Sequence, residues 1–176
     1  AEIAAANKRN AEKSGTTAPK AGTTAASKFV LSAEGKVASD NFKANKGKLP
    51  WPVEKGFVSQ KFGDQPHQIQ PKLIVHSNGV EITTESGSSA RAVFAGTVYS
   101  IQILSPINTL VMIQHGDFIT VYQNLSSVSV KKGDKVSIKQ TIGKIRTNDS
   151  TGKTALKFSV LQNDTFLNPQ SWIYNM

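Results

Sequence analysis

The side chains that could carry out metal chemistry in this 176-residue chain are three histidines, His67, His76 and His115, together with twelve carboxylates. The chain has no cysteine, which excludes thiol nucleophiles, disulfides, cysteine zinc sites and iron–sulfur clusters. A catalytic zinc site needs three protein ligands and one open position for water. Histidine and carboxylate ligands are therefore the one zinc chemistry open to this sequence, and the elements that position them decide whether it exists.

Composition and charge narrow the classes of partner. The net charge is +9, with nine basic against four acidic residues in 1–48 and twelve against eight in 49–176. Only three basic residues are arginines, Arg9, Arg91 and Arg146, and no aromatic–basic stacking motif accompanies them, so we expect no nucleic-acid partner. A lysine-rich surface of this kind suits solubility or attraction to an anionic envelope. No apolar stretch approaches the roughly 18 residues of a membrane span.

The chain divides into an N-terminal extension, residues 1–48, and a domain, residues 49–176. Residues 1–13 are rich in alanine and charge and favour a helix, either the end of a longer coiled coil or a frayed polar terminus. Residues 14–27 form a linker of low complexity. Because the chain begins at alanine with no initiator methionine or signal peptide, we expect a mature or trimmed chain, or part of a longer protein.

A short helix is expected at 38–44, just before the domain. Ser39 or Asp40 would cap its start. Its apolar stripe would come from three residues, Leu31, Val37 and Phe42. Together with the apolar residues 29–31, the helix could lie against the domain and shield a groove as a restraint. Alternatively, this segment leads the preceding coiled coil into the domain.

From Leu49 onward the pattern is that of β-strands, because runs rich in Val, Ile, Phe, Thr and Tyr alternate with Gly, Asn, Asp and Pro. The candidate strands are 57–62, 73–75, 80–83, 89–93, 96–104, 109–115, 118–125, 135–138, 142–146 and 155–161. The run TLVMIQHGDFITVYQN at 109–124 indicates a hairpin. No helical pattern separates the strands, so we predict a mainly β domain with an antiparallel sheet or sandwich.

Glycines in the segments 92–101 and 130–145 fall where a strand must turn tightly, a spacing shared with the lipoyl and biotinyl carrier barrels. Lys132 and Lys135 flank a Gly-Asp turn of this kind. The exposed tip motif that a carrier needs around its modified lysine does not accompany them, so a carrier domain is not favoured.

An ordered set of motifs resembles the LytM/lysostaphin-type zinc metallopeptidase domain over residues 49–176. The matching segments are LPWPVEKGFVSQKFG (49–63), SNGVEI (77–82), ARAVFAGTV (90–98), the run 110–145, TALKFSV (154–160) and NPQSWI (168–173). Each motif is weak alone, whereas the ordered set is specific. The resemblance implies an antiparallel β-sheet domain of the LytM, duplicated-hybrid-like kind, with a substrate groove.

The zinc ligands and catalytic histidines of that family are replaced in this sequence. The resemblance places them at five positions, which here hold Ser77, Glu81, Asn124, Ala155 and Lys157. One carboxylate does not make a zinc site, and the Lys157 ammonium donates hydrogen bonds only and repels a cation. The resemblance therefore implies a scaffold that has kept its groove but has no catalytic residues, no metal and no cofactor.

The three histidines do not occupy the ligand positions of the family. His76 lies one residue before the first ligand position, and one step along a strand turns a side chain to the opposite face. His115 sits in a turn where the family often carries a non-ligand histidine, so a hydrogen-bonded structural role is expected. A metallopeptidase with a shifted site built from His67, His76 and Glu81 stays open as an alternative.

The segments NFKANKGKLPWPVEKGFVSQKFG and VYQNLSSVSVKKG resemble the degenerate domains of EnvC-type murein hydrolase activators. That resemblance implies a periplasmic protein of Gram-negative envelopes that relieves the autoinhibition of an N-acetylmuramoyl-L-alanine amidase. A preceding coiled coil would link it to an upstream divisome membrane complex. The groove residues expected to bind the amidase are Ser77, Glu81, Arg91, Tyr122, Asn124 and Lys157. Alternatively, Glu81 and Lys157 pair with each other, or the domain binds peptidoglycan directly as a scaffold module.

Overall fold

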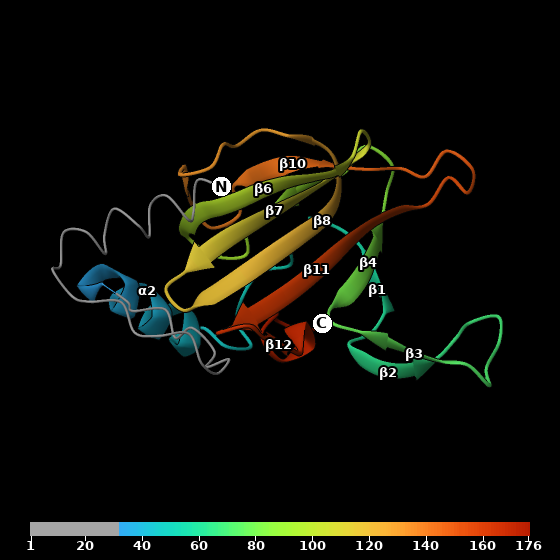
Figure 1. The fold of residues 1–176 in the computed structure, drawn as a ribbon, viewed down its shortest axis with the longest axis horizontal. Helices are drawn as coiled ribbons and strands as arrows, with labels where there is room; N and C mark the ends of the chain where they lie inside the picture. Colours follow the sequence, from blue (N-terminus) through green and yellow to red (C-terminus); the bar gives the residue numbers. More distant parts are fainter. Residues whose placement is uncertain (1–31) are drawn as a thin grey trace, which may run out of the picture.

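The computed structural model describes residues 32–176, and the expectations for 1–13, 14–27 and 29–31 lie outside that part of the chain. In the described part, one helix, α2 (Ala33–Ala44), precedes twelve strands and a short 3-10 helix, η1 (Pro169–Ser171). Figure 1 shows β6, β7, β8 and β11 running side by side, with α2 at one end of the molecule and the β2–β3 ribbon at the other. The predicted mainly β, antiparallel fold is thereby confirmed.

The strands follow the predicted runs closely. They are β1 (Phe57–Gln60), β2 (Gly63–Pro66), β3 (Ile74–Ser77), β4 (Val80–Thr84), β5 (Ser89–Arg91), β6 (Gly96–Ser105), β7 (Asn108–His115), β8 (Phe118–Val128), β9 (Lys135–Val136), β10 (Thr141–Ile145), β11 (Thr154–Gln162) and β12 (Thr165–Leu167). The main path of the large sheet is β1-β4-β11-β8-β7-β6-β9, and β2 pairs with β3 in a separate ribbon. The sequence pattern does not predict β2 and β12, because runs of four and three residues are too short to show alternation.

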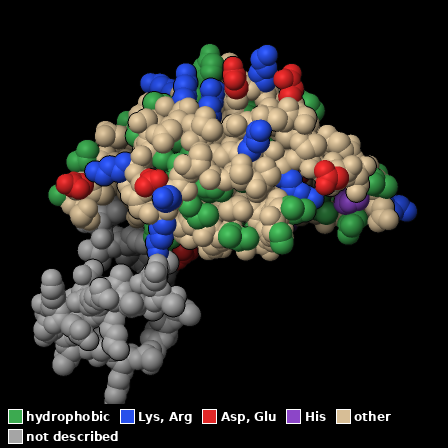
Figure 2. Space-filling model, turned by 90° about the horizontal axis from the view of Figure 1, so that it is seen from above, with side chains coloured by type: hydrophobic (Ala, Val, Ile, Leu, Met, Phe, Trp, Pro, Cys, Tyr) green, Lys and Arg blue, Asp and Glu red, His purple; other side chains and the backbone are tan. Residues whose placement is uncertain are grey.

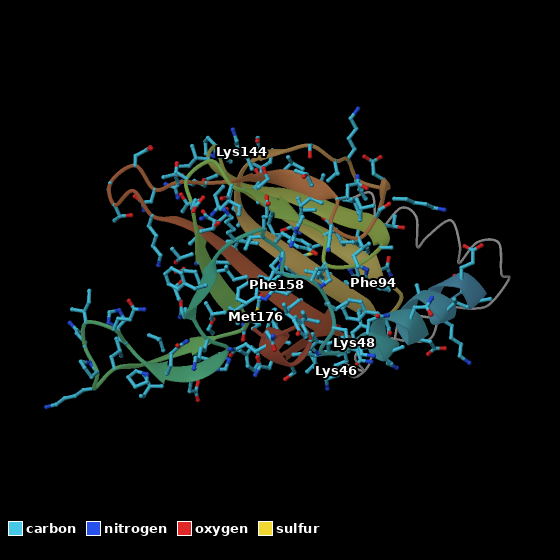
Figure 3. The ribbon with its side chains drawn as sticks, turned by 180° about the vertical axis from the view of Figure 1, so that it is seen from behind. Lys46, Lys48, Phe94, Lys144, Phe158 and Met176 are labelled. Atoms are coloured by element: carbon cyan, nitrogen blue, oxygen red, sulfur yellow. The ribbon has the colours of Figure 1, made fainter. Side chains whose placement is uncertain are left out.

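The long strands separate a core face from an outer face, since pleating sends successive side chains to opposite sides. On β8, Tyr122 is fully buried in the core, whereas the neighbouring Gln123 is half-buried on the outer face. Figure 3 shows the molecule from behind and labels Phe158, which is fully buried in the core, and Phe94, which is half-buried and packs against the core. The other large side chains that are fully buried include Phe42, Phe118, Leu49, Ile82, Ile113 and Leu125.

Helix α2 begins at Ala33, earlier than predicted, because Ser32 caps it rather than Ser39 or Asp40. The Ser32 hydroxyl oxygen accepts a hydrogen bond from the backbone N–H of Gly35 at 3.1 Å. Ser39 is instead buried within the helix. Among the described residues, no helix is both long and apolar enough to cross a membrane.

Phe42 anchors α2 to the sheet. Its ring is fully buried and stacks on the rings of His115 and Trp172, with centroid separations of 4.9 and 5.0 Å. Val37, from the same predicted stripe, is 60% exposed. The chain before residue 49 therefore contributes a side chain to the core, while the domain boundary between residues 48 and 49 stays a prediction.

The turn between β7 and β8 packs directly on the backbone of α2. Gly116 has a φ of +73°, and a Cβ at this position would collide with backbone atoms of Gly35 and Ser39. Glycine is the residue that tolerates both the left-handed backbone and this close approach. The hairpin tip and the helix are therefore held together with no side chain between them.

His115, beneath this turn, is the structural histidine that the sequence predicts. It is fully buried, its Nδ1 lies 2.7 Å from the Ala95 carbonyl oxygen, and its Nε2 lies 2.9 Å from Thr120 Oγ1. A carbonyl only accepts, so Nδ1 carries the proton and the neutral ring accepts at Nε2 from the Thr120 hydroxyl. Burial lowers the pKa of His115 to about 4, although the bond to Ala95 raises it.

The buried His115 should make the stability of the domain depend on pH. Its pKa is about 4 in the folded state and 6.5 in the unfolded chain, so the unfolded chain binds more protons between these values. The free energy of unfolding should therefore fall by about 3 kcal/mol through this residue as the pH drops from about 6.5 to about 4. Urea unfolding of the wild type and of His115→Gln across this range measures the effect. An equal decline in both proteins would assign the pH dependence to other groups.

Candidate functional site

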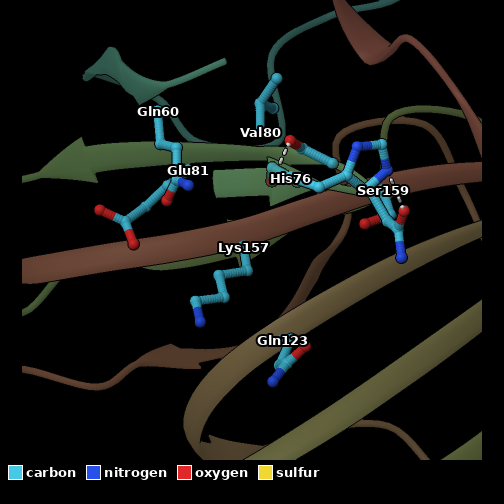
Figure 4. Close-up of a pocket in the computed structure, with 10 residues that line it drawn as sticks. Gln60, His76, Val80, Glu81, Gln123, Lys157 and Ser159 are labelled. Atoms are coloured by element: carbon cyan, nitrogen blue, oxygen red, sulfur yellow. Dashed lines mark hydrogen bonds between the residues drawn. The ribbon is translucent and has the colours of Figure 1, made fainter. Parts of the chain in front are cut away.

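Four polar side chains form a row across the outer face of the sheet. Gln60 of β1 pairs in register with Glu81 of β4. Lys157 of β11 lies between Glu81 and Gln123 of β8, in register with both. These residues line a cavity of about 250 Å³, in which Lys157 stands between Glu81 and Gln123 (Figure 4). The structure thus brings together two of the residues that the sequence analysis assigned to the groove, Glu81 and Lys157.

The turn between β3 and β4 forms the wall of this cavity. Ser77, at the end of β3, lines it, and the Ser77 hydroxyl donates a hydrogen bond to the Gly79 carbonyl at 2.8 Å. A Cβ on Gly79 would collide with Ser159 and with the backbone of Phe158, so this turn lies directly against β11. A third predicted residue, Ser77, therefore belongs to the site and holds its wall in shape.

His76 also lines the cavity, but both of its ring nitrogens have partners. Nδ1 lies 2.6 Å from Asp64 Oδ1 across the β2–β3 ribbon, and Nε2 lies 3.0 Å from Asn78 Oδ1. The hydrogen bond to Asp64 is the main cause that raises the pKa of His76, and burial opposes it. Two oxygen acceptors around one ring suit the imidazolium form, which cannot bind a metal.

The structure does not support a shifted metal site. His67 lies in the loop after β2, where its Nδ1 accepts hydrogen bonds from the backbone N–H groups of Ile69 and Gln70, each at 3.2 Å. Within residues 32–176, no three side chains from His, Cys, Asp and Glu are grouped so that they could hold a metal ion. His67, His76 and Glu81 are therefore not brought together as ligands, contrary to that alternative.

Glu81 is held by partners other than the one considered from the sequence. Its Oε1 forms an ion pair with Lys153 Nζ and accepts a hydrogen bond from Ser59 Oγ at 3.0 Å. The Glu81 side chain is 17% exposed and that of Lys153 is 44% exposed. Within the described residues, no hydrogen bond or ion pair engages the Lys157 ammonium. The alternative of a Glu81–Lys157 pair is therefore wrong for this structure, in which Glu81 pairs with Lys153.

Tyr122 does not form part of the cavity floor, contrary to expectation. Its ring lies in the core, and its hydroxyl accepts a hydrogen bond from the Val93 N–H at 3.0 Å. The hydroxyl of Thr120 is 3.2 Å away. Burial raises the pKa of Tyr122 to about 12, so the hydroxyl stays protonated. The neighbouring residue Gln123 lines the cavity instead, because adjacent residues of a strand face opposite ways.

Asn124 lies next to the cavity without lining it. The register of β7 and β8 shifts at this residue, which has a φ of 78°. Its Nδ2 donates a hydrogen bond to the Ala155 carbonyl at 2.6 Å, and its N–H donates to Asn108 Oδ1 at 3.2 Å. The two positions where the resemblance places catalytic histidines, Asn124 and Ala155, are therefore bonded to each other and serve to join β8 to β11.

Arg91 lies in a different cavity, contrary to its assignment to the groove. Its Nε donates a hydrogen bond to the Trp51 carbonyl at 2.9 Å. The cavity around it has a volume of about 530 Å³ and shares no residue with the one around Lys157. Glu54, Glu85 and Lys139 are its other charged residues. β5 carries Arg91 to this place because it pairs with β10 rather than with the strands of the site.

The side chains at the family's ligand positions do not fit zinc. Ser77 donates its hydrogen bond to a backbone carbonyl, and the Glu81 carboxylate is neutralised by a lysine. Lys157 presents an ammonium, which offers no lone pair to a metal. These three positions therefore do not supply the ligands of a catalytic zinc.

Several residues of the site are missed by sequence reasoning. Gln60, Gln123 and Ser159 line the cavity, and Lys153 fixes Glu81. Two of them carry a signal in the sequence: Ser159 lies two residues after Lys157 on β11 and so shares its face, and Gln123 is adjacent to Tyr122 on β8 and so faces the opposite way. Nothing in the sequence marks Gln60 or Lys153 as a site residue. The register between β1 and β4 places Gln60 at the site, and the shape of the loop between β10 and β11 places Lys153 there.

The described part of the N-terminal extension, residues 32–48, does not cover the cavity around Lys157. Helix α2 packs on the ends of β7 and β8 and on Trp172, and no residue of α2 lines the cavity around Lys157. In Figure 1 the helix lies at the end of the sheet opposite the β2–β3 ribbon. The restraint considered for this segment therefore finds no support in residues 32–44, and residues 29–31 lie outside the described part.

Solved structures share this fold. Csd3 of Helicobacter pylori superposes with a TM-score of 0.60 and 27% identity, over 73% of this chain and 35% of that one. The SpoIIQ protein in the SpoIIQ–SpoIIIAH pore-forming complex superposes with a TM-score of 0.59 and 25% identity, over 74% of this chain and 92% of that one. Lysostaphin of Staphylococcus simulans, at 20% identity and a TM-score of 0.56, shares the fold alone.

Sequence relatives and a family profile agree with the fold. Stage II sporulation protein Q of Bacillus subtilis is 30% identical over 102 residues, which cover 55% of this chain and 36% of that protein. An uncharacterized protein of Haemophilus influenzae is 29% identical over 100 residues, or 56% of this chain and 24% of that protein. The chain thus spans between a quarter and about a third of the length of these curated relatives. The profile of Peptidase family M23 matches residues 75–169, more than half of the chain, so the chain belongs to this family.

Proposed function

We propose that this domain is a non-catalytic member of its family that binds an N-acetylmuramoyl-L-alanine amidase in the Gram-negative periplasm and relieves its autoinhibition during cell separation. The observation that carries the proposal is the Lys157 ammonium on the floor of the cavity, which has no partner among residues 32–176. A lysine at this position cannot serve a metal-dependent hydrolysis, whereas it can bind an anionic group of a partner.

Two further observations support binding to another protein. The resemblance to EnvC-type activators rests on two segments of the sequence, 41–63 and 121–133, which include β1 and most of β8 of the site. The SpoIIQ structure, which shares this fold, is that of a complex with a second protein. A preformed groove is suited to receive an amphipathic segment through a few apolar anchors and a polar rim.

An activator of this kind works by shifting a population. An amidase that is blocked by its own helix exchanges between a closed and an open state, and the activator must bind the open state more tightly. Moving the ratio of open to closed from 1:99 to 99:1 requires about 5.5 kcal/mol of differential binding. A groove that takes up the inhibitory helix only after it has left the amidase active site would provide such a difference.

Binding to isolated sacculi separates this proposal from a peptidoglycan-binding scaffold. The purified chain should sediment with sacculi only when the amidase is present, because the amidase brings it to the wall. Sedimentation to the same extent without amidase would favour the scaffold function instead.

Zinc analysis addresses the remaining alternative, a metallopeptidase. Protein purified without chelators should contain far less than one equivalent of zinc, since the residues at the ligand positions do not suit it. One equivalent of tightly bound zinc would contradict the non-catalytic assignment.

A further inference from the structure

We infer that Lys157 is a carboxylate-binding subsite, which receives an acidic side chain of the protein partner, and that Lys153 keeps this subsite open by holding Glu81 away from it. The inference rests on the proposed function, because the carboxylate is assigned to the bound amidase. The inference names a carboxylate as the chemical group that the groove recognises, and it gives Lys153, which lies outside the cavity, a positioning role.

The position of the Lys157 charge favours binding of an anion. Lys157 sits in the middle of a sheet row, so its Cα is fixed by β4 on one side and β8 on the other. Its side chain is exposed into the cavity, and no partner within residues 32–176 engages its ammonium (Figure 4). A rigidly mounted cation of this kind is ready to bind an anion without first breaking another bond.

The carboxylate nearest to this cation in the sheet does not neutralise it. Glu81 lies directly opposite Lys157 on the neighbouring strand. Side chains that face each other across two strands in this way are close enough to interact. The Glu81 carboxylate is nevertheless turned to Lys153 and Ser59. Lys153 precedes β11 in the chain, so the loop between β10 and β11 supplies the cation that satisfies Glu81. The Glu81–Lys153 pair therefore leaves Lys157 available to an external carboxylate.

On the side of Lys157 that faces away from Glu81, the neighbouring side chains are neutral and polar, which suits a carboxylate. The side chains nearest to it in the row and beside it on β11 are Gln123 and Ser159, which can donate to the oxygens of a carboxylate. A cavity of about 250 Å³ has room for one acidic side chain and water, but not for a folded element. The group that enters should therefore be a single carboxylate from a segment lying across the sheet.

The outer face beyond the cavity indicates the kind of segment that carries this carboxylate. The sheet rows next to Lys157 place an apolar strip on the same face, formed by Leu110, Met112, Ile119, Val121 and Leu161. Leu110 and Val121 are buried and Met112, Ile119 and Leu161 are half-buried, so this strip presents little apolar surface of its own. Figure 2 shows hydrophobic side chains interspersed with polar ones along the lower margin of the described part, and most of the Lys, Arg, Asp and Glu side chains along the upper margin. The occupant should therefore be a segment that lies across this face and is anchored mainly by its acidic residue on the exposed Lys157.

Substitution of Lys157 tests the subsite directly. Lys157→Met keeps the length of the side chain and removes its charge, so the dissociation constant for the amidase should rise about tenfold or more. Lys157→Arg should retain most of the affinity, because it can still bind a carboxylate. Lys144→Met, on the exposed part of β10, is the matched control and should bind like the wild type. The dissociation constants are measured by calorimetry at two salt concentrations.

A double-mutant cycle tests the role of Lys153 as a positioning residue. Lys153→Met should weaken amidase binding, because the released Glu81 turns to Lys157 and neutralises it. Glu81→Gln should bind at least as well as the wild type. The double variant Lys153→Met/Glu81→Gln should regain wild-type affinity, a rescue that a merely structural role of Lys153 would not produce.

The outcomes separate this inference from the proposed function. If the wild type binds and stimulates the amidase but Lys157→Met binds equally well, the subsite is overturned and the proposed function stands. If the wild type neither binds nor stimulates the amidase, both fail. If the wild type binds sacculi instead, and Lys157→Met loses that binding, the carboxylate belongs to peptidoglycan and the assignment to a protein partner is overturned.

Discussion

Replacing Phe42 by alanine should lower the free energy of unfolding by about 3–5 kcal/mol, the cost of removing a fully buried aromatic ring. The ring contacts those of Phe118 and Trp172 as well as His115, so its removal opens a cavity between α2 and the sheet. A loss of this size would approach the whole stability of a small domain. Urea unfolding followed by tryptophan fluorescence measures it, since Trp172 lies against the ring.

Val37→Ala is the matched control for Phe42→Ala. Val37 lies on the same helix but is 60% exposed, so its truncation should change the free energy of unfolding by less than about 0.5 kcal/mol. Equal small effects of the two substitutions would mean that α2 does not pack on the domain in solution and that the chain before residue 49 is separable from it.

Reversing the charge of Lys157 should have the largest effect on partner binding. Lys157→Glu would place two carboxylates directly opposite each other on β11 and β4 and would repel the acidic group of the partner. We expect amidase binding to weaken roughly a hundredfold or more. The melting temperature should fall by only a few degrees, because two like charges facing each other across strands cost about 0.2–1 kcal/mol and the exposed Lys157 side chain has no partner to lose in the described chain.

Lys144→Glu is the control for a general change in charge. It makes the same substitution on an exposed lysine of β10, outside the cavity, and should leave amidase binding within about twofold of the wild type. Binding by Lys157→Glu that matches the wild type, with an unchanged melting temperature, would remove the cavity around Lys157 from the partner interface.

The strands were predictable because local chemistry marks their boundaries. Gly116 and Asp117 mark the tight turn between β7 and β8, and the apolar residues on either side alternate regularly. The changed residues Ser77, Glu81 and Lys157 could be found because each falls within a motif of known order. His115 could be assigned a structural role because its turn matches one where the family carries a non-ligand histidine.

The face to which a side chain points was harder to predict where a strand is irregular. The motif that includes Tyr122 and Asn124 places both in the groove, but the register between β7 and β8 shifts at Asn124, and Gln123 rather than Tyr122 faces the cavity. Arg91 was assigned to the groove from a motif that does not show which strand β5 pairs with. The Glu81–Lys153 ion pair joins residues 72 positions apart, and the conformation of a loop decides it.

The most direct test of the proposed activator function is the release of dye from labelled peptidoglycan by an autoinhibited amidase of the same envelope. We predict that the wild-type chain alone releases no dye, that the amidase alone releases little, and that the two together release much more. Lys157→Glu should fail to stimulate release, whereas Lys144→Glu should stimulate it normally. Dye release by the chain alone, or an amidase rate that the chain does not change, would contradict the proposed function.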